Sequence, residues 1–113
     1  LRSGMRSNST VEILFEQILE SIEATTQWSD RVETVVEIPQ DVERHLLRTA
    51  ELVRMLPETS RLRLETTNYR RIMAMRNAIV HSFLGRNVPG LMQMIRNDIP
   101  TLKKQIGMQM SRT

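Results

Sequence analysis

The sequence predicts an all-α domain, an antiparallel bundle of four to five helices with a kink in the last one. Apolar residues recur at intervals of three and four along several long stretches, as on one buried face of a helix. Only four Gly and four Pro interrupt the 113 residues, and a single segment has the β-branched composition of a strand. A chain of this length with 40% hydrophobic residues supports one core. We therefore expect a single helical domain.

The first helix is predicted to begin at Ser9, which forms a capping box with Glu12. Its buried stripe consists of Val11, Leu14, Phe15, Ile18, Leu19 and Ile22. Four glutamates lie on the opposite side, which favours a solvated face. Residues 1–8 are expected to form a disordered N-terminus, in which residues 1–4 are a cloning remnant before a native Met5.

Residues 25–38 lose the helical period and are rich in β-branched residues. A lone strand would have no partner in this chain, so we interpret the segment as a connection with a short helical turn. Trp28 is expected to close one end of the core.

A second helix is predicted from Pro39, since proline is accepted in a first turn, and Pro57 ends it. Its apolar stripe consists of Val42, Leu46, Leu47, Ala50, Val53 and Leu56. His45 lies within this helix. No second ligand stands at metal-binding spacing around it, so we interpret it as a surface or packed histidine.

After a linker at 57–67, a third helix is predicted with Thr67 or Asn68 as its cap and Gly85 at its end. Its apolar residues are Ile72, Met75, Ile79 and Phe83. Asn87 is predicted to cap a fourth helix with Pro89 in its first turn. Because the apolar stripe continues past Pro100, we expect a kink or restart at residues 98–100. The domain then spans residues 9–107, with a tail at 108–113.

Charge is distributed unevenly along the chain. Residues 1–60 have a net charge of −5 and residues 61–113 a net charge of +8, and eight of the ten basic residues in the second part are Arg. These charges fit either solvated helix faces or an anion-binding surface, and arginine favours phosphate. Aromatic residues are too few for a base-stacking platform. No apolar run approaches the roughly 20 residues of a membrane span, and the chain has no cysteine, so we expect a cytoplasmic protein.

One segment, residues 69–87, concentrates four Arg, two Asn and one His. No phosphate-binding glycine loop, dinucleotide fingerprint or zinc-protease motif is present in the sequence. On a straight helix Asn77 and His81 share a face, whereas Arg76 and His81 are offset by about 140°. Either the helix distorts near Gly85, or the site is completed across the bundle or a dimer axis.

The string from Met75 to Gly85, MRNAIVHSFLG, followed by NDIPTLKKQI from Asn97, resembles the HEPN superfamily and its HepT-like branch of small toxins. The superfamily motif is Arg, four to six residues, then His, and Arg76 to His81 fits the four-residue form with Asn77 after the Arg. The similarity extends over most of residues 10–107. The HEPN-like fold that it implies, an antiparallel helical bundle, agrees with the periodicity.

The resemblance implies a metal-independent endoribonuclease toxin without cofactors that acts on RNA as a homodimer, beside an MNT-type nucleotidyltransferase antitoxin. His81 would act as general base or acid, Arg76 would stabilise charge on the phosphoryl oxygens, and Asn77 would orient the phosphate or hold His81. Candidate phosphate contacts, that is substrate-binding residues, are Arg70, Arg71 and Arg86.

One position departs from the family pattern. Phe83 stands where the HepT-like pattern usually has a Tyr that resembles an acceptor of adenylyl groups. Phenylalanine has no hydroxyl, so an antitoxin would act by binding or by modifying another residue.

Two further interpretations remain open. In the first, the chain is a non-catalytic module that binds a nucleotide or a nucleotidyltransferase. In the second, Arg76, Asn77 and His81 form only a polar network that locks a helix dimer.

Overall fold

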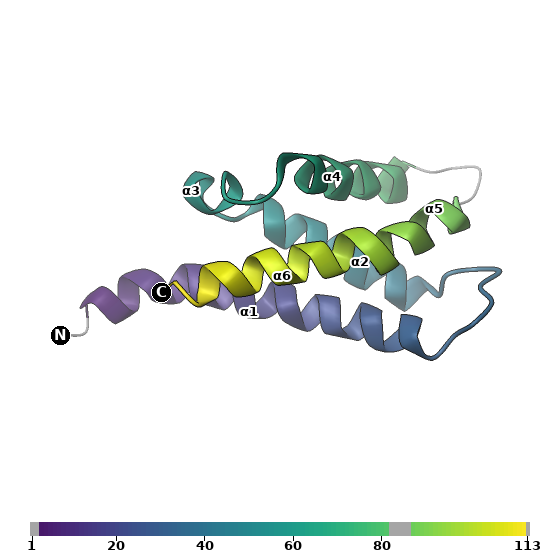
Figure 1. The fold of residues 1–113 in the computed structure, drawn as a ribbon, viewed down its shortest axis with the longest axis horizontal. Coiled ribbons are helices and arrows are strands. Elements are labelled where there is room, and N and C mark those ends of the chain that lie inside the picture. The colour runs from purple at the N-terminus through teal and green to yellow at the C-terminus, as the bar shows by residue number, and fades with distance from the viewer. Residues whose placement is uncertain (1–2, 82–86, 113) are drawn as a thin grey trace.

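The computed structural model describes residues 3–81 and 87–112, and their side chains from Thr10 onward (Figure 1). The helices are α1 (Ser3–Asp30), α2 (Gln40–Arg54), the short α3 (Glu58–Arg61), α4 (Thr66–His81), α5 (Val88–Gln93) and α6 (Ile99–Met110). A π-helical turn, Met94–Asp98, joins α5 to α6 in one kinked helix. The described ranges contain no strand, so the predicted all-α bundle with a kinked last helix is confirmed.

The four long helical segments run alternately in opposite directions (Figure 1). Helix α1 packs on α2, α2 on α4, α4 on the π-helical turn, and α6 returns to α1. The predicted stripes meet in one core, except that Leu47 is half-buried and lies outside it. The most deeply buried core residues include Phe15, Ile18, Ile22, Leu46, Ile72, Ile95, Ile99, Leu102 and Ile106. This burial is what stabilises the bundle, since short isolated helices are marginal in water.

Helix α1 is longer than the sequence predicted at both ends. It begins at Ser3, so Ser9 lies inside the helix, and it runs to Asp30 through the segment expected to be a connection. The buried Thr25 side chain donates to the backbone oxygen of Ser21 at 3.2 Å, so its hydroxyl is satisfied inside the helix. Trp28 is half-buried and packs against the core near the end of α1. Tertiary burial here overrides the weak helix propensity of threonine.

The predicted linker 57–67 contains helix α3, which the sequence did not indicate. Gln109 of α6 is buried and donates to the backbone oxygen of Ser60 at 3.0 Å, which ties α3 to the last helix. Helix α4 begins at Thr66, one residue before the first predicted cap. Asn68 is therefore not a cap: its side chain is buried and donates to the backbone oxygen of Asp98 at 3.0 Å.

The start of the last helix agrees with the prediction. The Asn87 side chain accepts from the backbone N–H of Gly90 at 3.1 Å, and Pro89 lies in the first turn. The π-helical turn ends immediately before Ile99 and Pro100. A proline removes a backbone donor and clashes with the carbonyl four residues earlier, and a widened turn at that point relieves the clash. Phe83, Gly85 and Arg86 lie outside the described residues.

No described helix is long and apolar enough to cross a membrane.

Candidate active site

Helix α4 buries Ile72, Met75 and Ile79 against the core. The candidate site residues lie at other positions of the helix, and Arg76 among them is half-buried. Asn77 and His81 are both exposed, and His81 is the last residue of the helix.

His81 lines a surface cavity of about 520 Å³ between α4 and the α5–π-helical segment. Ala74 and Ala78 of α4 and Leu91 and Met94 of the facing segment supply its apolar wall. Its polar residues are His81, Arg71, Asn87 and Gln93. The imidazole therefore lines a recess whose wall is mostly apolar.

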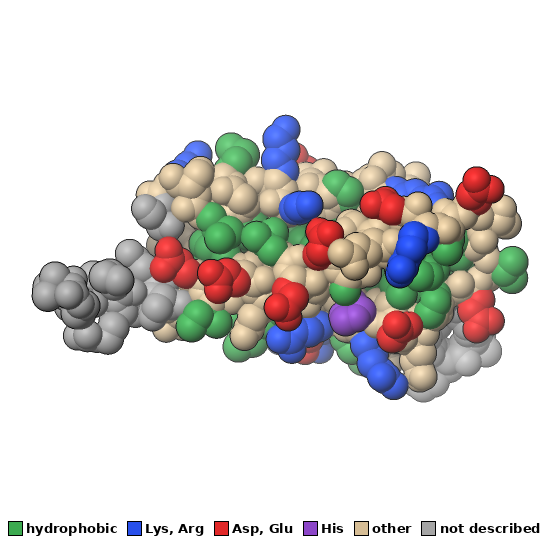
Figure 2. Space-filling model, turned by 90° about the horizontal axis from the view of Figure 1, so that it is seen from below, with side chains coloured by type: hydrophobic (Ala, Val, Ile, Leu, Met, Phe, Trp, Pro, Cys, Tyr) green, Lys and Arg blue, Asp and Glu red, His purple; other side chains and the backbone are tan. Residues whose placement is uncertain are grey.

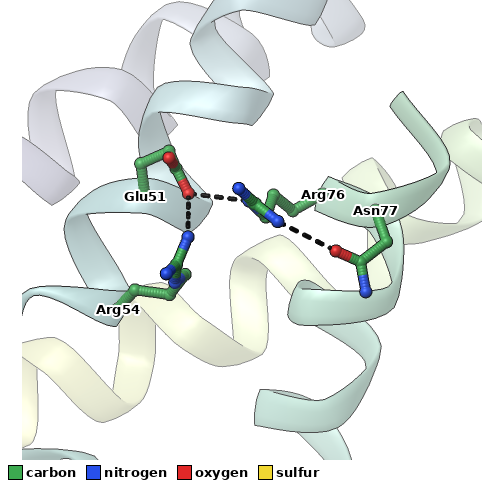
Figure 3. Close-up of polar contacts among 4 residues, drawn as sticks. All are labelled: Glu51, Arg54, Arg76 and Asn77. Atoms are coloured by element: carbon green, nitrogen blue, oxygen red, sulfur yellow. Dashed lines mark hydrogen bonds and ion pairs between the residues drawn. The ribbon is translucent and has the colours of Figure 1, made fainter. Parts of the chain in front are cut away.

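Arg76 does not line this cavity and faces helix α2 instead. Its Nε donates to Oε1 of Glu51 at 2.8 Å, and its Nη1 donates to Oδ1 of Asn77 at 3.0 Å (Figure 3). Arg54 of α2 donates to the same Glu51 oxygen at 3.0 Å. One carboxylate thus lies between two guanidinium groups from two helices, as Figure 3 shows.

The electrostatics of this group follow from its geometry. The hydrogen bond from Arg76 lowers the pKa of the Glu51 carboxyl below its ordinary value, and Arg54 adds to the effect. Glu51 is therefore ionised wherever the protein is folded near neutral pH.

Arg76 and His81 are thus not brought together within one chain. Helix α4 is α-helical through His81, so the described part of the helix shows no distortion that would align the two side chains. The described contacts join Asn77 to Arg76 and not to His81. A second surface must meet α4 if Arg76 and His81 are to act on one phosphate.

The other predicted phosphate contacts are placed differently. Arg70 is exposed on α4. Arg71 lines the cavity, and its Nε lies 3.0 Å from both carboxylate oxygens of Asp98. Arg86 lies outside the described residues.

Sequence reasoning missed the two carboxylates, Glu51 and Asp98. Glu51 contacts Arg76 across 25 positions, and no local pattern signals such a pair. The sequence does contain a feature that points to Asp98. It is one of only two acidic residues in the basic stretch 61–113, and the other is Glu65.

Acidic side chains are prominent on another face of the molecule. Figure 2, which shows the molecule from below, has acidic groups spread among basic ones on the side where α1 lies. Glu16, Glu20 and Glu23 of α1 are exposed. Among the residues with described side chains, no group of three or more His, Asp or Glu is placed to hold a metal ion.

The fold and site together define a class: a small antiparallel helical bundle that presents an Arg-Asn pair and a cavity-lining His on one helix. The family model for HepT-like proteins, described as Ribonuclease HepT-like, matches residues 6–108. The chain therefore belongs to the HepT-like ribonuclease family, and its expected substrate is RNA. A search of curated proteins and a search of solved structures each found no match.

Proposed function

We propose that this protein is a metal-independent endoribonuclease toxin that cleaves RNA through attack of the ribose 2′-hydroxyl on the adjacent phosphate. The observation that supports it is the placement of His81, exposed at the end of α4 and lining a surface cavity of about 520 Å³. His is the side chain best suited to proton transfer near neutral pH.

The reaction needs no metal-bound water, because the nucleophile is the 2′-hydroxyl of the RNA itself. His81 accepts the proton of the 2′-hydroxyl, the 2′-oxygen forms a bond to phosphorus, and the bond from phosphorus to the 5′-oxygen breaks. The leaving oxygen takes a proton from an imidazolium, and the product is a 2′,3′-cyclic phosphate. Arg76 stabilises the charge that develops on the phosphoryl oxygens, and Asn77 supports the guanidinium through its 3.0 Å contact.

The active form is proposed to be a homodimer. Arg76 faces α2 and His81 faces the cavity, so one chain presents only half of the catalytic pair to each surface. A second copy supplies the missing half when two α4 helices face each other across a two-fold axis.

The proposed partner is an MNT-type nucleotidyltransferase antitoxin that restrains the toxin by binding. Phe83 has no hydroxyl to modify, so restraint at this position depends on contact. Copurification with a co-expressed neighbouring nucleotidyltransferase supports this pairing, whereas a chain that remains alone in the pull-down contradicts it.

The test of catalysis compares the wild type with His81→Ala on single-stranded RNA in EDTA. We expect the wild type to give fragments ending in a cyclic phosphate and His81→Ala to give none. His45→Gln is the matched control, because it removes the other histidine, half-buried on α2, and should keep cleavage.

Each other outcome favours a different interpretation. Absence of cleavage on several RNAs, with all proteins folded, favours a non-catalytic module that binds a nucleotide or a nucleotidyltransferase. Loss of folding or of the dimer in His81→Ala favours a purely structural network.

A further inference from the structure

Two arginines converge on one carboxylate at the α2–α4 contact. Arg54 and Arg76 both donate to Oε1 of Glu51, at 3.0 and 2.8 Å. Because both nitrogens donate a hydrogen bond to the same oxygen, the distance between them cannot exceed the sum of the two donor–acceptor distances. The two guanidinium groups therefore form a close pair, although they belong to different helices (Figure 3).

The pairing leaves positive charge unbalanced. One carboxylate faces two guanidinium groups, so the three side chains together have one net positive charge. Like charges repel at such distances, and Glu51 is the group that holds them together. The hydrogen bonds to Glu51 and Asn77 use only part of the N–H groups of each arginine.

Stability alone gives little reason for this arrangement. The side chains of Arg54, Glu51 and Arg76 are 49%, 45% and 26% exposed, and ion pairs that solvent reaches in this way contribute little to folding. A fixed pair of planar donors at the surface is, in contrast, well suited to phosphate oxygens.

We infer that Arg54 and Arg76 form a clamp for a backbone phosphate of the RNA, with Arg54 as a further binding residue and Glu51 as the residue that positions both. The inference rests on the proposed function for the identity of the phosphate. The clamp lies on the α2 side of α4 and includes Arg76, so the phosphate that it holds is the one that Arg76 stabilises in the proposed reaction, with Arg54 as a second donor to it.

The first test measures binding of an uncleavable 2′-O-methyl RNA oligonucleotide at several salt concentrations. Arg54→Gln is expected to reduce the slope of log affinity against log salt by about 0.7, the value for one phosphate contact on a single strand. Arg48→Gln is the matched control, because it removes the same charge from an exposed position of α2 outside the clamp. Equal loss of slope and affinity in both variants overturns the clamp, since it would reflect net charge alone.

The second test asks whether removal of the negative charge of Glu51 tightens or weakens RNA binding. Glu51→Ala raises the net positive charge and should tighten RNA binding if only long-range attraction matters. The clamp predicts the opposite, at least a threefold weaker affinity, because both guanidinium groups lose their anchor. Glu51→Gln retains an acceptor oxygen and should fall between Glu51→Ala and the wild type.

Glu20→Ala is the control for this series, because it makes the same charge change on the exposed face of α1. Thermal unfolding checks that each variant is folded. If Glu51→Ala tightens binding as Glu20→Ala does, the positioning role of Glu51 is wrong.

These measurements can contradict the clamp without contradicting the proposed catalysis, and the reverse. Binding that depends on Arg54 without any cleavage of ordinary RNA retains the clamp and contradicts catalysis. Cleavage of ordinary RNA together with an unchanged salt slope in Arg54→Gln retains catalysis and overturns the clamp.

Discussion

At the scale of single residues, the contact between Glu51 and Arg76 determines how the carboxylate responds to acid. Arg76 first and Arg54 second lower the pKa of Glu51. The folded-state pKa therefore lies below that of the unfolded chain. The ion pair stabilises the fold above the unfolded-state pKa of the carboxyl, and this contribution is lost as pH falls through the lowered value.

A titration of the Glu51 carboxyl by NMR checks this. We expect a midpoint below the ordinary glutamate range in the wild type, and a return toward that range in Arg76→Met. Arg54→Met should raise the midpoint less, because its hydrogen bond is the smaller of the two causes. A larger rise in Arg54→Met than in Arg76→Met would contradict the assignment.

Asn68 is a second residue whose chemistry can be tested. Its side chain is 2% exposed, donates to the Asp98 backbone oxygen, and has at Oδ1 no hydrogen-bond partner among the described residues. Asn68→Ala should lower the free energy of unfolding by about 1–3 kcal/mol, the cost of a lost buried hydrogen bond.

Asn68→Asp is the sharper variant, because it keeps the shape and exchanges a donor for an acceptor. We expect a greater loss than for Asn68→Ala at neutral pH, since the new carboxylate is buried and its pKa is raised. Urea unfolding should show the loss shrinking in acid, where the carboxyl is protonated. A loss independent of pH would show that the site admits water.

At the scale of elements, replacement of two glycines of the last helix by alanine should change the stability of the protein in opposite directions. Gly107 is exposed in α6, and a Cβ there would meet nothing within 4 Å. Gly107→Ala should therefore stabilise the protein by about 0.5–1 kcal/mol, by reducing the entropy of the unfolded chain. A Cβ at Gly90 would lie 2.6 Å from Nδ2 of Asn87.

Gly90→Ala must displace the Asn87 side chain that caps α5 at 3.1 Å. The lost cap costs about 0.5–2 kcal/mol, and Gly90 lies in the first turn of α5, where alanine gains less helix propensity than the roughly 1 kcal/mol of a helix interior. Thermal unfolding of the two variants should give a higher midpoint for Gly107→Ala and a lower one for Gly90→Ala. The same sign for both would mean that the cap contributes little.

The elements also show where prediction from sequence succeeds. The apolar stripes located the main helices, and Pro100 located the kink, because both depend on local spacing. The extension of α1 to Asp30 depends on the burial of Thr25, and the four residues of α3 are too few to show a period.

The candidate site, like the fold, could be predicted from the sequence only in part. The offset of Arg76 from His81 follows from the helical period of the sequence alone. The partner of Arg76 on α2 could not be found from spacing, because it depends on how two helices pack.

At the scale of the whole molecule, a mixing experiment tests whether two chains share one active site. Arg76→Ala and His81→Ala should each be inactive. When subunits of the two variants are exchanged by unfolding and refolding together, each mixed dimer has one site with both residues intact. Random pairing should restore about a quarter of the wild-type activity. A mixture that stays inactive, with dimers present, would contradict a composite site.

The contact of Arg76 with Glu51 has a consequence for what the Arg-x4-His motif means. Both residues of the motif lie on α4, yet α2 sets the orientation of the guanidinium. A peptide spanning residues 66–81, or the same string grafted onto another helix, would contain the motif without this anchor. The motif is therefore not portable: its geometry is a property of the folded bundle, and a match to the string alone is not a match to the site.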